Sequence, residues 1–263
     1  MNTAALEIEL MTLPTQDNLP SDDGEPMETE RHIKQMDLLI KTLEPWLATR
    51  QDGYVGGNMF VYYSAQQWRH QDFKGPDVFV ALEVPPGERK SWVSWQEGKT
   101  PDVVIELLSD STAKYDKTKK KHLYQTQLKV AEYFWYDPFN SDDFKGFQLV
   151  GGVYQELPLE AQQYLVSHQL GLTLIRWLGT YRGVETTWLR WATLAGELLL
   201  LPEETQLQRA NAEAQRADTE AQRANVEAQR ANVEAQRAHQ EAQARQQAEA
   251  EIARLTALLA ERS

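Results

Sequence analysis

The sequence predicts one domain of the α/β or α+β class followed by a long helix, and three patterns carry this prediction. Residues 103–108 and 132–137 are strand-like runs joined by a helical segment, an order typical of parallel neighbours linked by a crossover. Residues 147–150 and 153–157 flank a Gly-Gly pair, which is the signal of a tight hairpin. After Pro202 the chain becomes a seven-residue repeat of Ala, Gln, Glu and Arg, as in coiled coils.

The composition is that of a globular protein with a substantial core, because 41% of its 263 residues are hydrophobic and 10% are aromatic. No run of 18 apolar residues and no secretory signal is visible, so we expect a cytoplasmic protein without a membrane span. The absence of cysteine excludes disulfides, thiolate catalysis and Cys-ligated metals. The histidines show no metal-ligand spacing, and we expect each at the surface or in a helix cap: His32, His70, His122, His168 and His239.

Three segments follow from the patterning. Residues 1–25 mix Pro, Asp, Gly and Thr without apolar periodicity and are expected to form a disordered acidic arm. Residues 26–202 form the globular domain, and residues 203–263 form the repeat. The domain opens with a predicted helix that starts at Glu28 and ends near Pro45 or Trp46, since apolar residues recur every three to four positions between them.

Further strands are expected at residues 56–64, 75–82, 170–177 and 187–191, with residues 198–202 closing the domain. A segment bearing two tryptophans leads into the strand at 103–108. The later tryptophans are interpreted as core or rim packing and not as a platform for stacking bases: Trp135, Trp177, Trp188 and Trp191.

The repeat predicts a coiled-coil seam, because alanines alternate steps of four and three from Ala210 to Ala242. Alanine buries little area, so we expect the last turns, which carry Ile252 and Leu255, to associate best. Glutamates line one flank of the seam without an opposite charge on the other. The pattern therefore allows a homodimer or a heteromeric coiled-coil partner but requires neither, and a lone helix braced by Glu and Arg pairs is the alternative.

The net charge of −12 argues against a broad nucleic-acid-binding surface. Locally the balance differs, since five lysines fall within residues 114–121. They can form a basic patch on an acidic body or simply a solvated helix face.

Glu106 is the candidate for chemistry, because it is an acid inside an apolar strand, PDVVIELLS. Burying an ionised carboxylate is unfavourable unless a cation compensates it, so a metal or a lysine is expected nearby. Asp77, at the mouth of another strand, is the candidate partner, whereas Asp102 lies about 13 Å away along the same strand. The residues thus indicate metal-dependent phosphate chemistry or, alternatively, a structural buried ion pair.

A resemblance adds to this reading. The motifs GPD ending at Asp77, PDVVIELLS around Glu106, then Asp116, Lys120, Tyr124 and EYFWYDP, resemble the restriction endonuclease family of the Uma-two type, which is abundant in cyanobacteria and belongs to the PD-(D/E)xK nuclease-like superfamily. The resemblance covers about residues 28–202. It implies a restriction-endonuclease-like mixed sheet flanked by helices, with Asp77 and Glu106 as metal ligands.

One position departs from the superfamily pattern. The usual lysine would stand two residues after the acid, where this chain has Leu108. The resemblance implies that Lys120, on the following helix, replaces it, with Lys117 and Lys121 as rivals. It also implies a ligand from the backbone carbonyl of Leu107. An additional acid near the metal would match Glu28, with Glu30 an equally good choice.

The resemblance therefore implies an endonuclease that hydrolyses DNA and uses Mg²⁺ or Mn²⁺. A nuclease acting on RNA fits the same residues. The alternative from another class is a catalytically inactive module that keeps the nuclease fold and recruits a partner through its coiled coil. The acidic balance favours it, since residues 203–263 hold 11 acidic and 8 basic residues and so leave a net charge near −9 on the rest.

Overall fold

The computed structural model describes residues 14–17, 19, 29–64, 73–160 and 163–260, and it divides into two compact units, residues 1–202 and 203–263. Most of the predicted acidic arm lies outside the described residues, and so does Glu28. The part of the arm that is described contacts the globular domain, where Trp95 Nε1 donates to the Pro14 carbonyl at 2.9 Å and Leu19 is buried.

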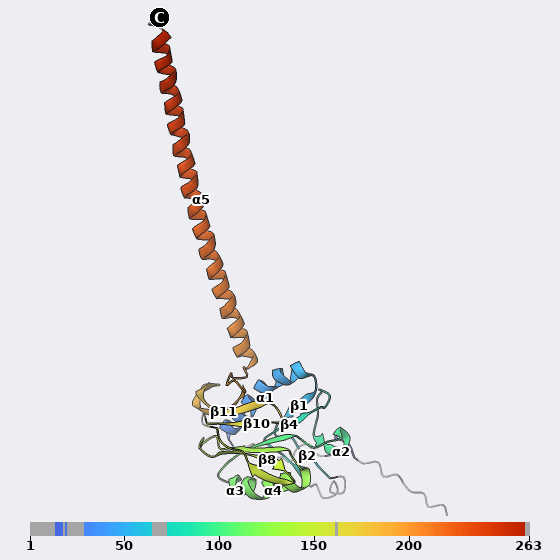
Figure 1. The fold of residues 1–263 in the computed structure, drawn as a ribbon. Coiled ribbons are helices and arrows are strands. Elements are labelled where there is room, and N and C mark those ends of the chain that lie inside the picture. Colours follow the sequence, from blue (N-terminus) through green and yellow to red (C-terminus); the bar gives the residue numbers. More distant parts are fainter. Residues whose placement is uncertain (1–13, 18, 20–28, 65–72, 161–162, 261–263) are drawn as a thin grey trace, which may run out of the picture. The chain divides into compact units, whose positions relative to one another are not determined.

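The first unit is built on a six-stranded mixed sheet (Figure 1). Its strands, in spatial order, are β1 (Gly53–Gly56), β4 (Val78–Leu82), β6 (Val103–Leu107), β7 (Glu132–Tyr136), β8 (Phe144–Val150) and β9 (Val153–Glu156). β6 and β7 are parallel, as predicted, and the other neighbours are antiparallel. The predicted hairpin joins β8 to β9 through Gly151 and Gly152, whose φ angles of 60° and 85° suit glycine.

Two smaller sheets complete the strand set. One contains β10 (Tyr164–Ser167), β11 (Leu172–Tyr181) and β12 (Val184–Thr193), all antiparallel. The other contains β3 (Phe73–Lys74), β2 (Val61–Tyr62) and β5 (Trp92–Val93). Sequence patterning predicted β11 and β12 but missed the short β10.

Helix α1 (Glu30–Arg50) is longer than predicted. Thr29 caps its start, since its hydroxyl accepts from the backbone N–H of His32. The expected end at Pro45 or Trp46 is wrong, because the helix continues through Pro45. Leu43 and Leu47 on either side of the proline are buried against the main sheet, and this packing compensates the hydrogen bond that proline cannot donate.

The main sheet is covered on both faces. Leucines of α1 and of β10 to β12 pack on one face. The other face is covered by a helical segment made of α3 (Ala113–Tyr115), η2 (Asp116–Lys120), α4 (Lys121–Leu123) and η3 (Tyr124–Leu128), while the short α2 (Ser94–Glu97) follows β5. In Figure 1 the labels α1 and β10 lie on the opposite side of the sheet from α3 and α4. The predicted core tryptophans Trp135, Trp188 and Trp191 are buried.

The expected strand at residues 56–64 is wrong, because the chain splits there into β1 and β2 of different sheets. A side chain at Gly57 would approach the Asp77 carbonyl to 2.6 Å, so the chain passes very close to β4 here. Asn58 follows in the left-handed region with φ 47°, and its N–H donates to the same carbonyl at 3.2 Å. The segment between β1 and β2 therefore holds the start of β4 in position.

The second unit is helix α5 (Pro202–Ala260), which is continuous. All side chains from Gln206 to Ala257 are exposed. Among the described residues, no helix combines the length and the apolar character needed to cross a membrane.

Candidate active site at the end of β6

Strand register brings Asp77 and Glu106 together. Val78 of β4 pairs with Ile105 of β6 in an antiparallel ladder, so Asp77 and Glu106 occupy the next facing positions. Facing residues have Cβ atoms about 5 Å apart and on the same side of the sheet. Alternation along β6 directs Val104 and Leu108 into the cluster under the helical segment, and Glu106 shares that face.

Glu106 is fully buried, and both of its carboxylate oxygens accept hydrogen bonds. Lys120 Nζ donates to Oε2 at 2.8 Å, and the Tyr124 hydroxyl donates to Oε1 at 2.8 Å. Asp77 is held by the backbone as well, since its Oδ2 accepts the N–H of Leu107 at 2.7 Å. The buried acid thus has the cation that its sequence context demanded.

Asp116 is a third acid in the cluster and was not predicted as a site residue. It is 2% exposed, and its Oδ1 lies 3.2 Å from Lys120 Nζ. One ammonium therefore serves several carboxylates. A spacing of four residues on the helix, from Asp116 to Lys120 to Tyr124, was the available sequence signal.

π-helical turns keep Asp116, Lys120 and Tyr124 on the side of the helical segment that faces the sheet. In an α-helix, a spacing of four residues overshoots one turn by about 0.4 residue, so such a row drifts around the helix. The segments η2 and η3 are π-helical and contain more residues per turn. Alternating them with α-helical turns offsets the drift, so Asp116, Tyr124 and Leu128 are all buried against the sheet.

Burial, together with an excess of negative charge, shifts the pKa values of the cluster. Burial raises the pKa of Glu106 to about 8; Lys120 opposes this shift, and the charges of Asp77 and Asp116 add to it. Burial likewise raises the pKa of Asp77, again against the effect of Lys120. Burial alone would lower the pKa of Lys120, but the surrounding carboxylates outweigh it and the net shift is upward. Lys120 is therefore a stable cation, and the raised pKa values mean that Glu106 and Asp77 hold protons more tightly than usual.

The rival lysines have other contacts. Lys117 forms an ion pair with Asp143, and Lys121 Nζ lies 3.3 Å from the ring centroid of Phe147. Asp102, set aside on distance, pairs with Lys99 at 2.7 Å. Of the three candidate lysines, Lys120 is the one that contacts Glu106.

The first turn of α1 contributes a buried histidine to the end of β6, whereas the expected acid Glu28 lies outside the described residues. Glu30 is exposed and pairs with Lys34 at 2.7 Å. His32, which was expected at the surface or in a helix cap, is buried and bonded to the capping Thr29, and its Nε2 lies 2.9 Å from the Leu108 carbonyl. A carbonyl only accepts, so Nε2 carries the proton and Nδ1 accepts from the Thr29 hydroxyl. α1 is thereby bonded to the end of β6.

The donor set suits a hard cation only in part. Two adjacent carboxylates are what Mg²⁺ takes from a protein when water and phosphate complete its shell. Within the described ranges, no group of three or more His, Cys, Asp or Glu is arranged to hold a metal ion. The Leu107 N–H has a partner in Asp77, and the expected role of its carbonyl stays a prediction.

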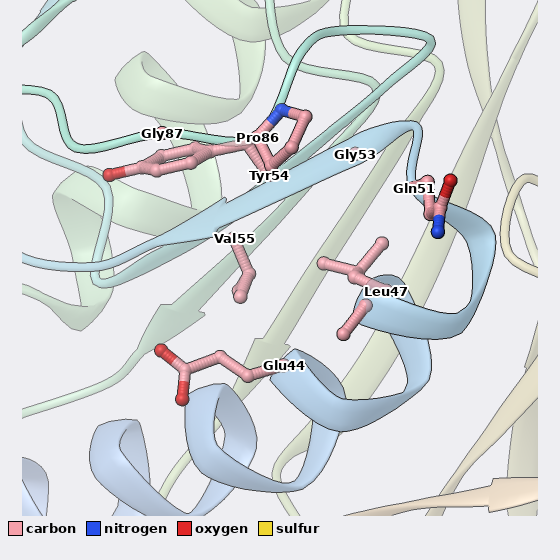
Figure 2. Close-up of a pocket in the computed structure, with 9 residues that line it drawn as sticks. Glu44, Leu47, Gln51, Gly53, Tyr54, Val55, Pro86 and Gly87 are labelled. Carbon is pink, nitrogen blue, oxygen red and sulfur yellow. The ribbon is translucent and has the colours of Figure 1, made fainter.

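A pocket of about 390 Å³ lies elsewhere in the first unit, and Figure 2 shows it between α1 and β1. Its lining is mostly apolar and shares no residue with the acidic cluster: Glu44, Leu47, Ala48, Gln51, Gly53, Tyr54, Val55, Pro86 and Gly87. Glu44 is its single charged residue, so it offers no constellation for catalysis.

Comparison with known proteins points to one family. The model of the Uma2 family, described as "Putative restriction endonuclease", matches residues 9–178, a range that contains Asp77, Glu106 and Lys120. Among solved structures, the crystal structure of a putative nuclease belonging to DUF820 from Anabaena variabilis is similar, with a TM-score of 0.41 and 16% identity over 60% of this chain and 90% of that chain. No curated protein matches.

Proposed function

Because the chain belongs to the Uma2 family, described as putative restriction endonucleases, we propose that its first unit is a magnesium-dependent endonuclease that hydrolyses DNA phosphodiester bonds. The observation that carries this proposal is the convergence of Asp77, Glu106 and Lys120 at the end of β6. The family match supports a nuclease function, and the site supplies the candidate machinery.

Each residue has a role in the proposed reaction. Asp77 and Glu106 would hold the divalent ion, which supplies Lewis-acid activation of water and phosphate when bound. Lys120 would orient the attacking water, favour its deprotonation and neutralise charge developing on the phosphate. Tyr124 fixes the rotation of the Glu106 carboxylate through its hydrogen bond to Oε1.

Exposed lysines beside the site provide a surface for the DNA backbone. Lys114 and Lys119 are exposed on the helical segment that carries Lys120, and Lys129 is exposed directly after its end. Among the described residues, none of the three forms an ion pair, so their ammonium groups are available to phosphates. This local patch reconciles DNA binding with the acidic charge of the whole chain.

The test is cleavage of supercoiled plasmid by the full chain with Mg²⁺ or Mn²⁺. Glu106→Gln and Lys120→Ala should each lower the rate by about 100-fold or more, as expected for losing a metal ligand or a cation that orients the water and stabilises developing charge. Lys145→Ala is the matched control, since it removes an exposed lysine that pairs with Glu156 on the β8–β9 hairpin. Equal nicking by all four proteins would show that the activity comes from a contaminant or another site.

A non-catalytic interaction module is the second candidate, favoured by the net charge near −9 of residues 1–202. Calorimetric titration with Mg²⁺ separates the two, because an inactive module has no need of a specific divalent-ion affinity. Parallel cleavage assays with double-stranded DNA and single-stranded RNA show which nucleic acid is the substrate. If the protein is a non-catalytic interaction module, α5 would recruit its partner.

A further inference from the structure

The side chain of Asp116 is only partly satisfied. Its Oδ1 is buried and has no hydrogen-bond partner among the described residues, although it lies 3.2 Å from Lys120 Nζ. The contact is therefore an ion pair without the geometry of a hydrogen bond. A buried carboxylate oxygen in this state is unfavourable, so its presence calls for an explanation.

Hydrogen bonds fix the backbone of Asp116, whereas the Lys120 ammonium beside it lies within reach of two carboxylates, those of Glu106 and Asp116. The Tyr133 hydroxyl donates to the Asp116 carbonyl at 3.0 Å, and the Asp116 N–H donates to Thr112 at 3.0 Å. Lys120 reaches Glu106 Oε2 at 2.8 Å and stands next to Asp116 Oδ1. A small movement of a flexible lysine head would exchange one acceptor for the other.

The proposed function requires such an exchange. If Glu106 holds a divalent ion, Oε2 must lose the ammonium that now occupies it, because two cations on one oxygen repel each other. Oε1 accepts the Tyr124 hydroxyl and keeps a second lone pair, but an ion bound there would still lie close to the ammonium on Oε2 and be repelled by it. The displaced ammonium needs a buried acceptor within reach, and Asp116 Oδ1 is one.

We propose that Asp116 is a positioning residue that receives the ammonium of Lys120 when Glu106 engages a divalent cation. This inference rests on the proposed function, because it presumes an ion at Glu106. Asp116 would keep Lys120 beside the reacting groups after it leaves Glu106. Its effect on the ion is thus transmitted through Lys120 and not by direct contact.

A double-mutant cycle on the full chain tests this route, with Mn²⁺ affinity measured by calorimetry. Asp116→Asn keeps the shape of the side chain and should weaken Mn²⁺ binding about tenfold, because Lys120 then stays on Glu106. In a Lys120→Met background the same substitution should change the affinity by less than about twofold, since no ammonium remains to be relocated.

Each other outcome has a defined meaning. If Asp116→Asn weakens binding equally in both backgrounds, Asp116 acts as a ligand or a bare charge and the inference fails, while the proposed function stands. If the unaltered chain binds no Mn²⁺, both fail. Circular dichroism verifies folding, and should Asp116→Asn not fold, Asp116→Ser replaces it in the same cycle.

Discussion

Glu132 is a second fully buried acid, and its surroundings differ from those of Glu106. It starts β7 and accepts from the Ser167 hydroxyl and from the backbone N–H groups of His168 and Gln169, at 2.6 and 3.1 Å. These donors lie at and just after the end of β10. Glu132 therefore joins the main sheet to the smaller sheet that covers it.

Glu132→Gln should make the protein relatively more stable as the pH rises. Burial raises the pKa of Glu132, against the effect of Ser167, the backbone donors and His168. A raised pKa in the folded state means that the contribution of Glu132 is fully present below its ordinary pKa of 4.5 and is lost as the pH rises through the folded value. Glutamine cannot ionise, so the difference in melting temperature, variant minus unaltered chain, should increase from pH 4 to pH 8. A constant difference would contradict this.

At the level of residues, the sequence predicted Glu106 more clearly than it predicted the residues that surround it. Glu106 stands out because it interrupts an apolar strand, and simple electrostatics then required a cation. Asp116 and Tyr124 showed only a helical spacing and a place in the family motif, and His32 has an ordinary explanation as a capping residue. Their proximity to β6 depends on how the elements pack.

At the level of elements, the helical segment over Glu106 shows how backbone geometry sets the site. The sequence predicted a helical segment here but not its π-helical turns, because the patterns used for helices assume 3.6 residues per turn. The β6–β7 crossover and the β8–β9 hairpin followed from local signals. The split between β1 and β2 did not, because it depends on the close approach of Gly57 to β4.

Deleting His122 tests the role of the π-helical turns. His122 is exposed and lies between Lys120 and Tyr124. Losing one residue would rotate Tyr124 by about 100° relative to Lys120, so its hydrogen bond to Glu106 and its packing should be lost together. We expect a loss of about 3 kcal/mol or more in the free energy of unfolding.

Urea unfolding followed by tryptophan fluorescence measures this change, since all eight tryptophans lie in residues 1–202. His122→Ala is the matched control and should stay within about 0.5 kcal/mol of the unaltered chain. A deletion as mild as the control would mean that the helix recovers its register without the π-helical turns.

At the level of the whole molecule, the two units follow different physical rules. Residues 1–202 bury aromatic and aliphatic side chains in two layers around a sheet. α5 spans 59 residues, with exposed side chains from Gln206 to Ala257, and its stability depends on helix propensity, on Glu and Arg pairs and on any partner helix. The alanine repeat made this division visible in the sequence, whereas no pattern within one chain specifies the partner.

Sedimentation equilibrium of the full chain should show self-association that a chain ending at Pro202 lacks. The apolar end of α5 should dominate the contact, because Ile252 and Leu255 bury more area than the alanines of the repeat. Replacing both with serine in the full chain keeps the length of the helix and should weaken association as strongly as the truncation does. If all three proteins sediment as monomers, α5 is a lone helix or awaits a different partner. If the substituted chain still associates while the truncated one does not, the alanine seam and not the apolar end is the interface.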